Sequence, residues 1–193
     1  MITQKRTSRR DEVIEQWWKK LHLSPQQLQA EKLSPWPTKY KAELKRCGTP
    51  DAAMLTEGFR SLWLALPESV RERQDHTIIA WATIACALAN VKDKTTKSFA
   101  SSLGEIDSAT DKPVVSELRF QQLQNAKSVD EFFTRLLRVI KQIKGVAEPA
   151  GLSTDILAWF DEHHSRQPRK ADKRIAVKWA MDYYVPNKSN KKA

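Results

Sequence analysis

The chain is poor in glycine and cysteine and has no long apolar run. It holds five glycines and two cysteines in 193 residues, and no glycine-rich phosphate loop is present. Cys47 and Cys86 cannot build a disulfide framework and indicate reduced, buried thiols in a cytoplasmic protein. No apolar run approaches the roughly 18 residues of a membrane-spanning helix, and residues 1–10 lack the apolar stretch of a secretory signal. We therefore expect no membrane segment.

Acidic residues are outnumbered by basic ones, 23 to 33, which gives a net charge of +10. Such an excess indicates a polyanionic partner, either nucleic acid or an anionic membrane surface. Residues 1–10 and 186–193 form two basic tails that carry 7 of the 10 excess charges. The body between them is therefore only weakly basic, and a folded nucleic-acid site requires local segregation of its charges.

Strand-type alternation is absent and helical periodicity recurs, so the predicted fold is all-α. The pattern indicates an irregular bundle of about eight to nine helices, without a solenoid repeat. The segment 77–89 is apolar nearly all round, which is typical of a central helix. The expected helices with two defined ends are 12–22, 40–47, 50–66, 77–89, 114–126, 153–160 and 170–184. Two more are expected to begin at residues 25 and 128.

Several helix ends carry local sequence signals. Asp11 can cap the first helix, and the segments that follow Ser24 and Ser128 have capping-box patterns. Gly48 is suited to a left-handed helix end. Residues 148–151 (EPAG) give the clearest linker.

This linker predicts an N-terminal helical bundle at 11–147 and a smaller C-terminal helical part at 152–185, flanked by the tails. A single bundle is the alternative.

The aromatic and apolar residues are expected mainly in the core. Trp63, Trp81, Trp159 and Trp179 fall on apolar helical faces, which favours packing over base stacking. Trp36 lies between prolines in an irregular segment. Leu55 is also expected to face inward.

One cluster resembles a metal or acid–base site, at residues 161–164. His163 and His164 are adjacent, and neighbouring helical residues point about 100° apart, so they do not chelate easily. Asp161 and His164 can share a helix face, but no further ligand is visible. The favoured interpretation is a helix end with histidine near its carbonyl groups. Catalysis, a metal and a cofactor are therefore not predicted.

The basic residues give the strongest functional pattern. Arg135, Arg138, Lys141 and Lys144 recur every three residues along the side of one helix opposite its apolar face. Arg119 is open to two interpretations, a structural ion pair near Glu117 or a phosphate contact. The remaining candidates are Lys45, Arg46, Lys92, Lys94, Lys97, Lys173 and Arg174.

These residue types suit binding to the phosphate backbone, because lysine and arginine neutralise phosphates without base-specific geometry. No helix-turn-helix pattern is found. The sequence predicts nucleic-acid binding without sequence specificity.

Several segments resemble those of a known family and follow one another in the same order as in that family. They are KYKAELKRCGTP (39–50), FRSLWLAL (59–66), ACALANV (85–91), FASSLG (99–104), SELRFQQL (116–123), LLRVI (136–140) and WAMDYY (179–184). Together with Leu157 to Phe160 and Lys173-Arg174, they make residues 11 to 185 similar to CasB, the small subunit of the type I-E CRISPR surveillance complex Cascade.

The resemblance implies an all-helical, non-enzymatic protein that forms a homodimer within the complex. It implies contacts with the CasC backbone subunits and the large subunit CasA. It also implies a role in holding the crRNA guide, the target DNA and the displaced strand, which stabilises the R-loop. By position, the implied nucleic-acid contacts are Lys45, Arg46, the 92–97 loop, Arg119, Arg138, Lys173 and Arg174.

Three other functions stay open at this point. A stand-alone helical DNA-binding regulator would bind tightly and sequence-selectively. An enzyme would use the Asp161–His164 cluster. A scaffold for protein partners alone would place the basic row of residues 135–144 in a protein interface.

Overall fold

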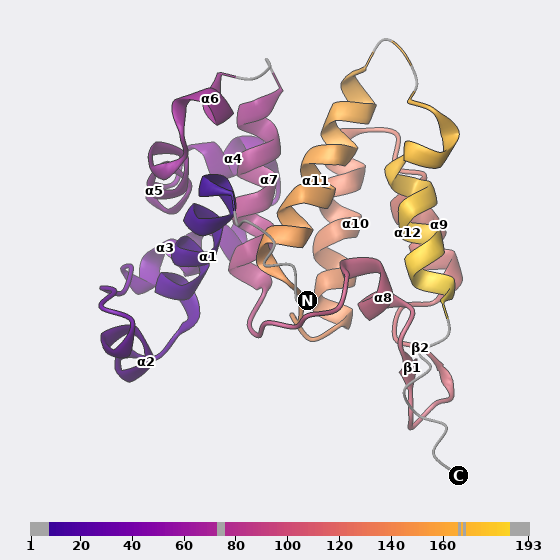
Figure 1. The fold of residues 1–193 in the computed structure, drawn as a ribbon, viewed down its shortest axis with the longest axis horizontal. Helices are drawn as coiled ribbons and strands as arrows, with labels where there is room; N and C mark the ends of the chain where they lie inside the picture. The colour runs from indigo at the N-terminus through magenta and orange to yellow at the C-terminus, as the bar shows by residue number, and fades with distance from the viewer. Residues whose placement is uncertain (1–7, 73–75, 166, 168, 186–193) are drawn as a thin grey trace, which may run out of the picture. The chain divides into compact units, whose positions relative to one another are not determined.

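The computed structural model describes residues 8–72, 76–165, 167 and 169–185. The fold is all-α as predicted, with 68% of the chain helical and twelve α-helices among the described residues, more than the eight to nine expected. The chain divides into two compact units, Met1–Ala89 and Asn90–Ala193 (Figure 1). Most of the first basic tail, all of the second and Arg166 lie outside the described residues. No helix in the described part of the chain is long and apolar enough to cross a membrane.

The N-terminal unit is built around short helices and one buried helix. Helices α1, α3 and α5 pack on one another, and Trp17 on α1 donates a hydrogen bond to Ser61 on α5 at 2.9 Å. Helix α7 is buried nearly all round, as its continuous apolar sequence predicted. The helices are α1 (Arg9–His22), α2 (Pro25–Ala30), α3 (Thr38–Arg46), α4 (Pro50–Met54), α5 (Glu57–Ala65), α6 (Glu68–Arg71) and α7 (Thr77–Asn90).

Three predicted helix ends in this unit are wrong. Helix α1 begins at Arg9, because Ser8 and not Asp11 provides the cap. Helix α3 ends in extended backbone at Cys47, and Gly48 is not left-handed. The helix expected at 50–66 is two helices, since the Thr56 hydroxyl accepts from Phe59 N and starts α5.

The break between α4 and α5 turns Leu55 outward. Its side chain is 80% exposed, although the sequence predicted it on the inner face. The capping box at Ser24 is present as predicted.

His22 gives the N-terminal unit a predictable dependence on pH. Its Nε2 lies 3.0 Å from the carbonyl oxygen of Leu88, and its ring stacks on Trp18. Burial, reinforced by the charge of Lys41, lowers the pKa of His22 from 6.5 to about 4. Below pH 6.5 the unfolded chain therefore binds a proton that the folded chain does not bind. This part of the stability is complete above pH 6.5 and is lost as the pH falls towards 4.

We expect this group to lower the free energy of unfolding by about 2 kcal/mol between pH 7 and pH 5. Urea unfolding of the wild type and of His22→Gln at both pH values measures it. The variant should lose less stability on acidification than the wild type. Equal losses in the two proteins would contradict the assignment.

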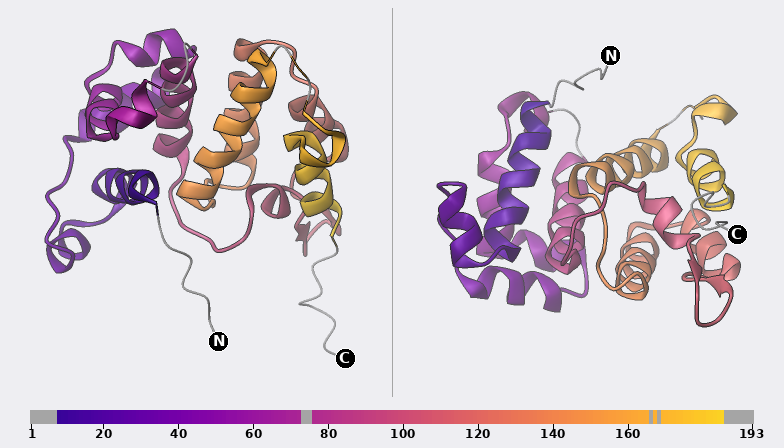
Figure 2. Two further views of the ribbon diagram at one scale, coloured as in Figure 1. Left: turned by 45° about the horizontal axis from the view of Figure 1, so that its top comes forward. Right: turned by 60° about the horizontal axis from the view of Figure 1, so that its bottom comes forward.

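The C-terminal unit contains stacked aromatic rings. Phe132 stacks on Trp159 with ring centroids 3.9 Å apart, and Phe120 stacks on Tyr183 at 4.0 Å. Helices α10 and α11 lie side by side in two views (Figures 1 and 2). The elements are α8 (Phe99–Leu103), β1 (Ile106–Asp107), β2 (Lys112–Pro113), α9 (Glu117–Gln124), α10 (Val129–Gln142), α11 (Pro149–His164), the 3₁₀ turn η1 (Ala171–Lys173) and α12 (Ile175–Tyr184).

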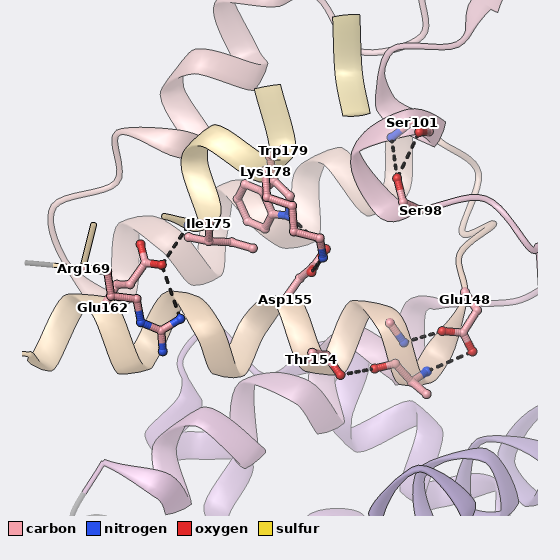
Figure 3. A network of polar contacts seen from close by, with 12 residues as sticks. Ser98, Ser101, Glu148, Thr154, Asp155, Glu162, Arg169, Ile175, Lys178 and Trp179 are labelled. Atoms are coloured by element: carbon pink, nitrogen blue, oxygen red, sulfur yellow. Dashed lines mark hydrogen bonds and ion pairs between the residues drawn. The ribbon is translucent and has the colours of Figure 1, made fainter. Parts of the chain in front are cut away.

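The segment predicted as a linker is the start of a helix. Helix α11 begins at Pro149, a favourable first helical residue, and the Glu148 side chain accepts from the backbone of Ala150 and Gly151 (Figure 3). Residues 148–151 therefore lie inside the C-terminal unit, and the division of the chain falls between Ala89 and Asn90.

Three further local differences occur in this unit. The strands β1 and β2 form an antiparallel hairpin with two residues on each side, too short to produce visible alternation in the sequence. Helix α9 covers only part of the helix expected at 114–126, and Leu118 on it is 66% exposed. Helix α12 begins at Ile175, after the turn η1, and not near residue 170. Its residues Ile175, Trp179 and Tyr183 are buried.

A buried carboxylate joins α11 to α12. Asp155 is 3% exposed and accepts from Trp179 Nε1 at 2.9 Å and from Lys178 Nζ at 2.5 Å (Figure 3). The sequence pattern of residues 153–160 predicts a helix but not these contacts, because nothing local in the sequence reveals partners 23 and 24 residues away.

Candidate nucleic-acid interface

Helix α10 presents a basic side opposite its core side. Ser128 caps the helix through the backbone N–H of Glu131, but Glu131 accepts from Lys127 N rather than closing the predicted capping box. Phe132, Phe133, Leu136, Val139 and Ile140 are buried. On the other side, Arg138 and Lys141 are exposed neighbours, one helical turn apart.

The end of α10 is shaped by two residues in the left-handed conformation. Lys144 has φ +57° and Gly145 has φ +76°, and Gly145 N donates to Ile140 O at 2.9 Å. A Cβ atom on Gly145 would lie 2.5 Å from Asn90 O, so glycine is required both for conformation and for space. The chain thus turns sharply directly after Lys144.

This turn holds the 92–97 loop. The carbonyl oxygen of Gly145 accepts from Lys92 N at 2.7 Å and from Asp93 N at 3.2 Å, and Ala147 N donates to Asp93 O. A Cβ atom on Gly145 would lie 3.2 Å from Lys92 Cγ, so the Lys92 side chain runs beside the turn. The sequence predicted an exposed loop here but did not predict its position beside α10.

We name Arg138, Lys141, Lys144 and Lys92 the α10 basic face. All four side chains are exposed. Within the part of the chain that the structure describes, none of them forms a salt bridge. Lys141 and Lys144 lie at the negative end of the helix dipole, which stabilises cations there. The face can therefore supply several positive charges to a polyanion without breaking an internal ion pair.

Three predicted residues have carboxylate partners. Arg135 is half-buried, donates to Gln122 O on α9 at 2.6 Å and lies 3.3 Å from a Glu131 oxygen. It ties α10 to α9 and is not part of the exposed row. The other two ion pairs are Lys97–Glu105 at 2.6 Å and Lys173–Asp172 at 3.4 Å.

The remaining predicted residues are exposed and lie on α3, on α9, before α12 and in the 92–97 loop. Lys45 and Arg46 end α3 in the N-terminal unit. Arg119 is exposed on α9, and no ion pair with Glu117 or another described residue is present. Arg174 Nε donates to Arg169 O at 3.2 Å, and Lys94 lies in the 92–97 loop. The candidates thus come from several elements of the two units.

The Asp161–His164 cluster is used in structural contacts. Asp161 lies 3.4 Å from Arg169. Glu162 lies 3.7 Å from Arg169 and also accepts from Ile175 N (Figure 3). His164 Nδ1 lies 3.0 Å from Phe160 O, and His163 stacks on Trp159. Among the described residues, no three His, Cys, Asp or Glu side chains are grouped to hold a metal ion.

The family model of the CRISPR-associated protein Cse2 matches residues 40–184, which is most of the chain. The chain belongs to the Cse2 family. Cse2, also called CasB, is the small subunit of the type I-E complex Cascade, so the resemblance inferred from the sequence is confirmed. Comparisons with curated proteins and with solved structures found no match.

The Cse2 match includes all the predicted site residues and the whole α10 basic face. It does not include α1, α2 or the segment that leads into α3.

Proposed function

We propose that this Cse2-family subunit binds the phosphate backbone of crRNA and target DNA in Cascade, without sequence specificity and without catalysis, and so stabilises the R-loop. The observation that carries the proposal is the α10 basic face, whose four cations are exposed and lack an ion pair among the described residues. Residues Lys45, Arg46, Arg119 and Arg174 add exposed cations elsewhere on the two units.

The arrangement favours phosphate contacts over base reading. Base edges are read by side chains on an element that enters a groove, whereas phosphates need only accessible positive charge. Helix α10 packs its other side against α9, so its charged side chains reach outward from a fixed body. R-loop formation exchanges duplexes of similar stability, and a few such contacts are enough to shift the balance.

The proposal extends to protein partners. We expect contacts with CasC and CasA and pairing with a second copy of the chain in the complex. Exposed apolar side chains on both units offer surface for such contacts, and they include Leu55, Leu64, Leu118, Met181 and Tyr184. Cys47 and Cys86 are not joined in a disulfide, which agrees with a cytoplasmic location.

Fluorescence anisotropy with a labelled single-stranded oligonucleotide, its duplex and an RNA of the same sequence tests the proposal. We expect weak binding to all three at 50 mM salt. If the four cations of the α10 basic face each contact one phosphate, the logarithm of affinity for the single strand falls with a slope of about −3 against the logarithm of salt concentration. Target binding by reconstituted Cascade provides the assay in the complex.

The proposal is wrong if the subunit alone shows no measurable binding at 50 mM salt and its presence does not strengthen target binding by Cascade. Enrichment of one motif from random duplexes would instead favour the stand-alone regulator.

A further inference from the structure

A groove in the N-terminal unit lies between the end of α1, the start of α3 and the proline-rich segment before α3. Its volume is about 570 Å³, which is within the usual range of small-molecule sites. All but one of the residues around it precede residue 40, where the Cse2 match begins. They are Lys20, Leu21, His22, Leu23, Pro25, Pro35, Trp36, Pro37, Thr38 and Lys41.

The charges around this groove have one sign. Lys20 and Lys41 line it, and none of its described lining residues is acidic. Lys20 Nζ lies 4.7 Å from the centre of the Trp36 ring, so the ammonium group is held beside an aromatic face. The groove is therefore suited to an anionic group that meets both lysines.

The remaining walls are apolar and rigid. Trp36 lies between Pro35 and Pro37, and these two prolines restrict the backbone on both sides of Trp36. His22 is uncharged at neutral pH because burial lowers its pKa to about 4. A ligand that fits these walls has a flat, weakly polar part as well as a negative charge.

We propose that the groove binds one nucleotide of a single-stranded nucleic acid, with its base against Trp36 and the prolines and its phosphate beside Lys20 and Lys41. Single strands are favoured because a paired base stays in its stack, whereas an unpaired base is free to contact an aromatic side chain. The site is separate from the α10 basic face. The inference extends the proposed function from phosphate contacts to contact with one base.

The test compares a labelled deoxycytidine decamer with the same decamer in which every base is absent, by anisotropy on the full chain. Both probes carry the same phosphates, so their difference reports base contact. We expect about 10-fold tighter binding of the intact decamer by the wild type. The preference should disappear in Trp36→Leu, and Lys20→Gln should weaken binding of both probes about threefold.

Lys39→Gln is the matched control, because Lys39 is exposed on α3, pairs with Glu57 at 2.6 Å and does not line the groove. Its affinities should equal those of the wild type apart from a small charge effect. Lys20→Gln leaves Trp36 in place, so the test does not depend on the folding of Trp36→Leu. Thermal melting checks both variants.

The outcomes separate this inference from the proposed function. Equal binding of the intact and abasic decamers by the wild type would overturn the groove assignment while leaving phosphate binding intact. Photo-crosslinks from an iodinated decamer to residues 20–41 are expected, and crosslinks to α10 alone would also overturn it. Tight binding of acidic peptides, with no base preference, would assign the groove to a protein partner instead.

Discussion

Replacing Arg138, Lys141 and Lys144 together by glutamine weakens binding of single-stranded DNA by about 10- to 100-fold at low salt. Each side chain is exposed on the α10 basic face, and each phosphate contact removed also removes a released counterion. The slope of affinity against salt concentration should therefore become shallower by about 2. Anisotropy titrations from 50 to 200 mM salt measure both quantities, and R-loop formation by reconstituted Cascade should fall in parallel.

The matched control removes three positive charges elsewhere. Lys32, Lys39 and Lys112 are exposed and lie outside the α10 basic face, so their triple glutamine variant has the same net charge. It should keep most of the affinity and most of the salt slope. If the two triple variants lose affinity equally, binding depends on net charge alone and the α10 basic face is not the site.

Asp155→Ala lowers the free energy of unfolding by about 3 kcal/mol. The carboxylate is buried and accepts from both Trp179 Nε1 and Lys178 Nζ (Figure 3). Its removal leaves the indole N–H of Trp179, itself 1% exposed, without an acceptor and opens a small cavity between α11 and α12. Urea unfolding followed by circular dichroism measures the loss.

Two further variants separate the contributions. Asp155→Asn keeps an acceptor for Trp179 and should cost less than the alanine variant. Lys178→Met removes a side chain that is 53% exposed; it leaves Asp155 paired with Trp179 and should cost about 1 kcal/mol. A stability of Asp155→Ala within the error of the wild type would show that the α11–α12 contact does not depend on this carboxylate.

The parts of the fold that sequence predicted well are those that depend on local patterns. The apolar segment that became α7 and the amphipathic segment that became α10 were both assigned correctly, because burial follows from the period of the apolar residues. The Ser24 capping box is also local. In contrast, a proline such as Pro149 is compatible both with a linker and with the first residue of a helix. Only the structure shows that it begins α11.

The residues of the candidate site are a prediction from the sequence, which does not show which of them lie together. Arg135 belongs to the predicted row on α10, but in the structure it donates to Gln122 on α9. Lys92 is not on α10, but the Gly145 turn holds it beside this helix. Neither change is visible in the period of one helix. Lys97 and Lys173 remain exposed but have acidic neighbours at 2.6 and 3.4 Å.

The sequence by itself determined that this chain is helical, basic and similar to CasB, because helix periodicity, net charge and segment order are properties of the chain alone. Tertiary structure decided which cations stay without a carboxylate partner, and where the chain divides into units. It also decided that Asp155 meets residues 23 and 24 positions away and that Lys20, Trp36 and Lys41 share one groove. The physical reason is that ion pairing, burial and cavities depend on distances between elements, and those distances are set only when the helices pack.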